Sequence, residues 1–159
     1  FSPNGQLLAT AGTDTIVRLW EVSVLADTRT AGAEIEPIVL RGPQSDVRDV
    51  AFSPDGRWLA AGGWDMVVRL WDITDLGAEP LLLHGHKDSI EAIAFSPDGR
   101  WLASGGWNED ARLWHVNMDD LIQLACRTAG RNLTREEWQR FLPNQPYRKT
   151  CPDLPEAAP

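Results

Sequence analysis

Two histidines, His84 and His86, are the side chains whose type and spacing come closest to a metal-binding pattern. Alternate residues of a β-strand share one face, so the two imidazoles could bind the same ion. A protein metal site needs further ligands, and no third one is evident nearby in the sequence. We therefore predict that the chain has no metal site and uses no cofactor.

Catalytic residue types are present, but no catalytic arrangement is recognisable. The carboxylates of Asp49, Asp65, Asp88 and Glu91 show no spacing that suggests an acid–base pair. Ser, His and Asp all occur, yet the sequence lacks a Gly-x-Ser-x-Gly elbow, a His-Glu-x-x-His pair and a Gly-rich phosphate loop. We therefore predict that this chain is not an enzyme.

The elements that must position these residues come from an internal repeat. Residues 52–60 and 95–103 both read Phe-Ser-Pro-Asp-Gly-Arg-Trp-Leu-Ala, and residues 1–9 are a degenerate copy. Each copy is followed by a Gly-containing turn and by Arg-Leu-Trp. Self-similarity at a period of about 40–50 residues predicts stacked supersecondary units.

Four strands per repeat are predicted from apolar pattern and turn residues. The first, at Val47–Phe52 and Ile90–Phe95, is apolar at both parities, which is typical of a strand buried on both faces. Ser-Pro-Asp-Gly then forms a tight type I turn, because Pro presets φ and Gly closes the turn. The later strands are predicted at 57–62, 67–73 and 80–83, at 100–105 and 111–116, and at 37–40. Four short strands in such a period predict a β-propeller.

These motifs resemble the WD-repeat β-propeller family over roughly residues 1–116. Gly85-His86 matches the first element of the family signature and Trp71-Asp72 the last, while Trp20-Glu21 and Trp114-His115 are relaxed versions. The resemblance implies an all-β fold, a partial β-propeller of four-stranded antiparallel blades with a short C-terminal helical tail at 117–159. It implies one complete blade, about residues 46–84, and two partial ones. We therefore expect a C-terminal fragment whose remaining blades lie upstream.

The resemblance also implies a hydrogen-bond relay of His, Ser or Thr, Asp and Trp that ties the strands of a blade together. The second repeat lacks two members, because Pro43 replaces the His and Ala61 replaces the hydroxyl. A buried Asp65 without its His partner would cost stability unless water satisfied it, so this blade is expected to depend more on apolar packing. The implied members are Thr10, Asp14 and Trp20; Asp65 and Trp71; and His86, Ser104, Asn108 and Trp114.

Partner binding is predicted at the turn between the second and third strands, where the family exposes side chains on its upper face. Trp64 and Trp107 stand in this turn, and Thr13 is the equivalent residue of the first repeat. Large aromatic side chains there could anchor a protein partner. Alternatively, each ring covers the turn of the neighbouring blade. Trp58 and Trp101, early in the second strand, are predicted to pack under the lower face.

The bulk composition is that of a globular protein, with 159 residues, 43% hydrophobic and 24% charged, and a net charge of −8. Such an acidic balance argues against binding to a nucleic-acid backbone. No apolar run approaches the roughly 18 residues of a membrane span. We predict a cytoplasmic protein-interaction or scaffold module of a larger regulatory protein, with protein partners and neither nucleic acid nor membrane as a partner.

The tail is predicted to contain two short helices. Residues 121–125 have helical spacing with Gly130 placed to end the helix, and Thr134-Arg-Glu-Glu137 predicts a capping box for a helix with Trp138, Phe141 and Leu142. The Pro-rich residues 147–159 are expected to be irregular. Cys126 and Cys151 could form a disulfide, but two reduced thiols are the preferred interpretation, with the pair close in space either way.

The tail is also basic, which leaves two interpretations open. It could dock on an acidic partner or nucleic acid, but packing on the chain's own acidic propeller is preferred. Its Cys-Arg-Thr-Ala-Gly-Arg-Asn-Leu-Thr-Arg-Glu-Glu-Trp segment is similar to an extension of bacterial WD-repeat sensors that follow a signal-transducing P-loop NTPase. The alternative function is therefore the sensor arm of such an NTPase, for which a phosphate loop upstream would decide. The basic residues are Arg127, Arg131, Arg135, Arg140, Arg148 and Lys149.

Overall fold

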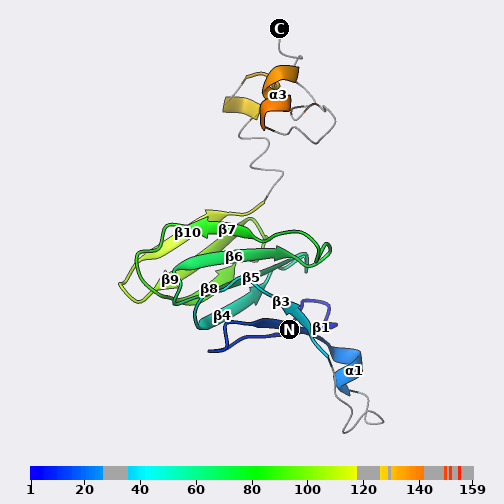
Figure 1. The fold of residues 1–159 in the computed structure, drawn as a ribbon, viewed down its shortest axis with the longest axis vertical. Coiled ribbons are helices and arrows are strands. Elements are labelled where there is room, and N and C mark those ends of the chain that lie inside the picture. Colours follow the sequence, from blue (N-terminus) through cyan, green and yellow to red (C-terminus); the bar gives the residue numbers. More distant parts are fainter. Residues whose placement is uncertain are drawn as a thin grey trace. The chain divides into compact units, whose positions relative to one another are not determined.

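The computed structural model describes residues 1–26, 36–117, 126–128, 130–141, 149, 151 and 154 (Figure 1). The chain divides into two compact units, Phe1–His115 and Val116–Pro159, which we describe separately. The predictions for residues 121–125, for Leu142 and for most of residues 147–159 lie outside the described residues.

The first unit is built from antiparallel sheets, and the part that is described contains three of them. Their strand orders are β1-β2-β3, β4-β5-β6-β7 and β10-β9-β8 (Figure 1). A short helix, α1 (Val22–Ala26), follows β2 and has no counterpart in the sequence prediction. The strands are β1 (Leu7–Thr10), β2 (Val17–Glu21), β3 (Ile38–Leu40), β4 (Val47–Phe52), β5 (Trp58–Gly63), β6 (Val67–Asp72), β7 (Leu81–His84), β8 (Ile90–Phe95), β9 (Trp101–Gly106) and β10 (Ala111–His115). These sheets are blades of a partial β-propeller, which confirms the predicted fold class.

The Ser-Pro-Asp-Gly segments form tight turns between the first and second strands. Gly56 donates its backbone N–H to the carbonyl of Ser53, and Gly99 donates to Ser96, both at 2.9 Å. Both glycines have φ near +70°, in the left-handed region where a side chain would be strained. The repeated turn sequence therefore produces the same hairpin in two sheets.

A cluster of buried apolar side chains fills the space between the first two sheets. Val17 and Leu19 of β2 are at most 1% exposed and belong to the same cluster as Val47, Leu59 and Trp71. Burial of such side chains is the main stabilising term of the fold, at about 1.5–3 kcal/mol each. The alternation of β2, with Val17 and Leu19 buried and Arg18 between them, follows from the period of a strand.

The second and third sheets approach each other closely because a glycine lies between them. A Cβ at Gly62 of β5 would come within 2.9 Å of both Ile90 and Ile93 of β8. The absence of that Cβ lets the two isoleucines fill the interface, where both are buried. On β10, by contrast, Leu113 is 72% exposed, whereas Leu70 at the equivalent position of β6 is 2% exposed.

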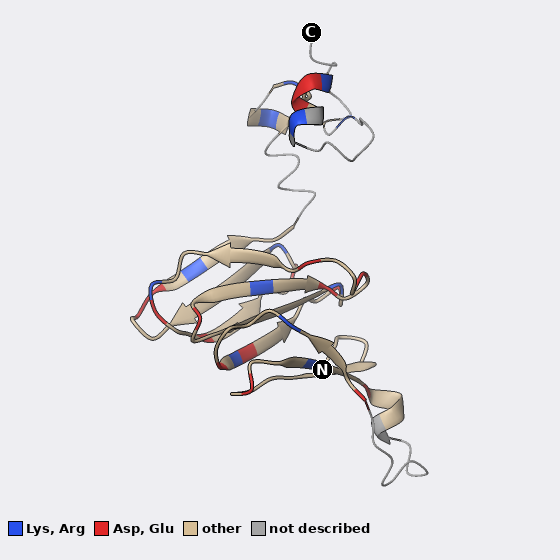
Figure 2. Cartoon of the chain, in the orientation of Figure 1, with Lys and Arg blue, Asp and Glu red and all other residues tan. Residues whose placement is uncertain are grey.

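The described part of the second unit contains a capped helix, α3 (Arg135–Phe141). Glu137 donates its backbone N–H to Thr134 Oγ1 at 3.1 Å, and Glu137 Oε2 accepts from the Thr134 N–H at 2.9 Å. This is the predicted capping box. Glu136 and Glu137 lie in the first turn and Arg140 in the last, which suits the helix dipole (Figure 2).

Cys126 and Cys151 form a disulfide, with Cα atoms 5.5 Å apart. The preferred interpretation of two reduced thiols is therefore wrong, although the expected closeness of the pair is confirmed. No local pattern indicates the bond, because neither cysteine belongs to a short Cys-x-x-Cys pair. None of the helices in the described ranges is long and apolar enough to cross a membrane.

Candidate functional site: the relay positions and the turn face

The third repeat brings His86, Ser104 and Trp114 together around one hydroxyl. His86 Nε2 lies 2.6 Å from Ser104 Oγ, and Trp114 Nε1 donates to the same oxygen at 2.8 Å. Ser104 is 2% exposed and His86 7% exposed. The three residues come from the loop before β8, from β9 and from β10, so the hydroxyl joins three parts of one blade.

Asn108, which stands at the Asp position of the expected relay, does not bond to His86 in the described structure. Its Oδ1 accepts the backbone N–H of Asp110 at 3.2 Å. Asp110 Oδ2 instead faces His86 Nδ1 at 3.9 Å, beyond hydrogen-bond distance. Burial lowers the pKa of His86, against the attraction of Asp110, so the imidazole is neutral in the folded protein at neutral pH.

The second repeat replaces the relay with an ion pair. Asp65 Oδ2 accepts from Arg69 Nη1 at 2.6 Å and from the backbone N–H of Gln44 at 2.9 Å. The side chains of Asp65 and Arg69 are only 12% and 7% exposed. Asp65 thus lacks a His partner, as expected, but its carboxylate is paired by Arg69 of β6, which the sequence analysis did not predict.

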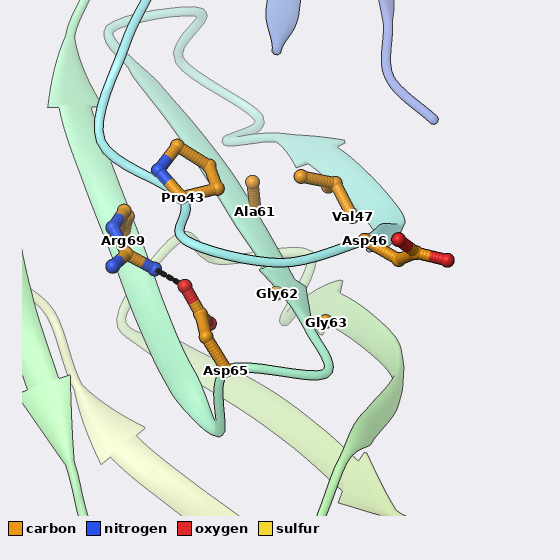
Figure 3. A pocket seen from close by; sticks show the side chains of 8 residues that line it. All are labelled: Pro43, Asp46, Val47, Ala61, Gly62, Gly63, Asp65 and Arg69. Carbon is orange, nitrogen blue, oxygen red and sulfur yellow. Dashed lines mark hydrogen bonds and ion pairs between the residues drawn. The ribbon is translucent and has the colours of Figure 1, made fainter. Parts of the chain in front are cut away.

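A small pocket marks the position of the missing relay residues (Figure 3). Pro43 and Ala61 stand where the third repeat has His86 and Ser104. Figure 3 shows Asp65 and Arg69 joined on one side of this pocket. Trp71, the last member of the expected relay, packs in the apolar core and is 5% exposed. The pocket is lined by Pro43, Asp46, Val47, Ala61, Gly62, Gly63, Asp65 and Arg69.

The first repeat contains, in more exposed form, both the tryptophan–hydroxyl hydrogen bond of the third repeat and the Asp–Arg ion pair of the second. Trp20 Nε1 donates to Thr10 Oγ1 at 2.8 Å. Asp14 Oδ2 pairs with Arg18 Nη1 at 2.6 Å, but these side chains are 48% and 30% exposed. The hydrogen bond from Arg18 holds the pKa of Asp14 below its usual value. Two repeats thus each have an arginine that lies four residues after the turn Asp and pairs with it. This pairing was not predicted from the sequence.

These hydrogen bonds hold strands together and leave no reactive group of the described relay positions in a catalytic arrangement. The hydroxyl of Ser104 is shared by His86 and Trp114, and Asp65 is neutralised by Arg69. Within the described ranges no group of three or more His, Cys, Asp and Glu side chains could hold a metal ion. Each described hydrogen bond of the relay thus joins strands or loops of one blade.

The residues predicted to bind a partner lie in the turn between the second and third strands of each sheet, which we call the turn face and define by Thr13, Trp64 and Trp107. Trp64 is 51% exposed and Trp107 is 73% exposed, and Thr13 is exposed as well. The exposed fractions show that each indole has a large area available for contact. Arg48 of β4 lies over the Trp64 ring, with its guanidinium carbon 5.8 Å from the ring centroid.

Replacing Ser104 by alanine is expected to lower the free energy of unfolding by about 1–3 kcal/mol, because the buried His86 and the half-buried Trp114 both lose their partner. The matched control is Thr10→Ala, which removes the equivalent hydroxyl from the exposed bond to Trp20 and should cost less. Urea unfolding of both variants measures the difference. Equal losses would show that burial of the Ser104 hydroxyl has no energetic consequence.

Comparison with known proteins identifies the repeats. A family model described as "WD domain, G-beta repeat" matches residues 1–21, 36–72 and 79–115. Each matched segment ends at the last residue of a third strand, Glu21 of β2, Asp72 of β6 or His115 of β10. The outermost strands β3 and β7 therefore fall in the matched segment of the following repeat.

Curated relatives are similar to this region over part of their length. They include "Probable cytosolic iron-sulfur protein assembly protein 1" of Malassezia globosa, 41% identical over 76 residues. "WD repeat, SAM and U-box domain-containing protein 1" of Danio rerio is 40% identical over 74 residues, and "Nuclear distribution protein PAC1" of Arthroderma otae is 39% identical over 71 residues. The alignments cover 45%, 46% and 45% of this chain but only 21%, 14% and 13% of those proteins.

Proposed function

The chain belongs to the WD40 family of WD-domain, G-beta repeats, and we propose that it is a non-catalytic module that binds a protein partner on its turn face. The observation that carries this proposal is the exposure of Trp64 and Trp107 at equivalent turns of two neighbouring sheets. Tryptophan is among the residues that contribute most to protein interfaces. Two such side chains on one rigid pair of sheets form an anchor for a partner of matching shape.

The repeats support this role through rigidity. The buried cores between the sheets fix the strands, so the turns present their side chains with little conformational freedom. A preorganised surface loses less entropy on binding than a flexible one. We propose a scaffold role within a larger regulatory protein for this chain, and the name of the relative from Malassezia globosa, a probable protein of iron-sulfur protein assembly, supports a role in assembly.

Replacing Trp64 and Trp107 together by alanine is expected to weaken partner binding by about 1,000-fold, since two hot-spot tryptophans at about 2 kcal/mol each would contribute about 4 kcal/mol. The partner is first captured with a cross-linker attached to a residue of the turn face, then identified and purified. Calorimetry with the purified partner measures the affinity of the parent and variant proteins.

The matched control is Trp101→Ala. Trp101 is also exposed, at 42%, but it lies at the start of β9, at the other end of that strand from Trp107, and contacts the ring of His115. Removing it should leave the affinity unchanged. Unchanged binding after loss of both Trp64 and Trp107, with an unaltered unfolding midpoint, would reject the turn face as the binding site.

A further inference from the structure

Trp64 and Trp107 occupy equivalent places in neighbouring sheets. Trp64 donates its backbone N–H to the carbonyl of Asp46 at 3.0 Å, and Trp107 donates to that of Ser89 at 2.9 Å. The inner strands β4 and β8 have the same register irregularity near their first residues. A bulge of this kind directs one side chain away from the regular ladder, and the residue concerned is Arg48 in β4 and Glu91 in β8.

The surroundings of Trp64 show which kind of group this face accommodates. The guanidinium of Arg48 lies over the ring, and Arg48 Nε is 3.3 Å from Glu91 Oε2 of the next sheet. An arginine is thus held between an indole face and a carboxylate, a combination that uses both its charge and its planar shape.

Trp107 is the equivalent indole in the next sheet, but the residue at the position of Arg48 there is acidic. The position of Arg48 is taken by Glu91, and the position of Met66 in the turn is taken by Glu109. Glu109 shares the left-handed φ of Met66, 64° against 63°, so the two turns have the same course. Asp88 and Lys87 precede β8, so the third repeat has three carboxylates and one ammonium at these positions, with Arg48 of the preceding sheet paired to one oxygen of Glu91. Trp107 itself is 73% exposed.

We propose that Trp107 binds an arginine side chain of a protein partner, stacked on the indole and paired with the carboxylates of Glu91 and Glu109. The bound guanidinium would reproduce at Trp107 the arrangement that Arg48 makes at Trp64. This inference rests on the function proposed above and specifies its ligand as an arginine-bearing segment. The acidic balance of the chain favours the approach of such a segment at low salt.

The experiment titrates the full chain, labelled with ¹⁵N, with a blocked Gly-Arg-Gly-Arg-Gly peptide while the indole N–H resonances are followed. The Trp107 resonance is expected to shift and saturate, and the affinity should fall as salt is added. A peptide with citrulline in place of arginine keeps the shape but removes the charge, and it should produce no saturable shift. A lysine peptide should bind more weakly than the arginine peptide.

Three variants test the geometry. Trp107→Ala should weaken the peptide by roughly 3- to 30-fold, the range expected for a cation on an aromatic ring. Glu91→Gln should weaken it less, because Glu109 remains. Glu91→Arg gives β8 the residue that β4 has at the equivalent position, Arg48. The new arginine should stack on Trp107 itself, so that the peptide no longer binds although the ring is still present. Unfolding midpoints confirm that each variant is folded.

Equal binding of the arginine and citrulline peptides, or unchanged affinity in Trp107→Ala, would overturn the arginine proposal. A salt-dependent shift of the Trp107 resonance without peptide would assign the ring to the chain's own basic tail and would also overturn it. If the double tryptophan variant loses partner binding but the peptides show no preference for arginine, arginine is rejected as the ligand and the turn face remains the binding site. If the arginine peptide binds but the double tryptophan variant binds the partner protein normally, the proposed function is rejected while the arginine site stands.

Discussion

Replacing Asp65 by alanine is expected to lower the free energy of unfolding of the propeller unit by about 3–5 kcal/mol, the usual cost of leaving one member of a buried ion pair without its partner. Arg69 is 6% exposed, so the change would leave a buried guanidinium without its carboxylate partner. The backbone N–H of Gln44 would lose its acceptor in the same step. Urea unfolding, followed by the signals of the propeller unit, measures the loss.

The first repeat provides the matched control. Asp14→Ala breaks a pair with the same four-residue spacing and the same 2.6 Å distance, but in solvent. Exposed pairs contribute little, so this variant should leave the unfolding midpoint nearly unchanged. A double variant, Asp65→Ala with Arg69→Leu, should recover part of the loss because no buried charge remains. Similar effects at Asp14 and Asp65, or no recovery in the double variant, would contradict the explanation.

This contrast marks one limit of the sequence. Asp14 and Asp65 occupy the same position of the repeat, and each has an arginine four residues later. The spacing alone does not reveal that one pair is covered by neighbouring sheets and the other is not, because burial depends on contacts between distant parts of the chain. For the same reason the sequence did not predict that Asp110, and not Asn108, would face His86.

The strands were more accessible to prediction. The inner strands Val47–Phe52 and Ile90–Phe95 have the predicted bounds, because a segment with apolar residues at both parities ends at a Ser-Pro-Asp-Gly turn in both repeats. The second strands begin one residue later than predicted, at Trp58 and Trp101. The reason is local, since Arg57 donates its backbone N–H to the carboxylate of Asp55 and so belongs to the turn.

The exposure of the turn face was only partly predictable. Position in the repeat placed Trp64 and Trp107 in exposed turns, but sequence alone left open whether each ring covers a neighbouring turn. The contact of Arg48 with Trp64, and its pairing with Glu91, joins residues of different sheets. Such a contact depends on how two bulges direct their side chains, which no local pattern encodes.

Replacing Cys126 by serine is expected to destabilise the tail unit by about 2–4 kcal/mol and to unfold it, while the propeller unit keeps its own transition. A unit as small as Val116–Pro159 buries too little apolar surface to be stable without a covalent staple. Its described core centres on Trp138, which is 2% exposed. Loss of the dispersed signal of the Trp138 indole N–H, in the variant or after reduction, measures the unfolding.

The hydrogen bonds around Asn132 explain why the disulfide and the fold of this unit depend on each other. Asn132 is 1% exposed; its Oδ1 accepts the N–H of Cys151, and its Nδ2 donates to the carbonyls of Cys151 and Leu154. These bonds position Cys151 for the disulfide but join segments that the disulfide must first hold together. Thr134→Ala, which removes only the helix cap, is the control and should cost about 1 kcal/mol. Retention of the Trp138 signal after full reduction would show that the hydrogen bonds of Asn132 suffice without the disulfide.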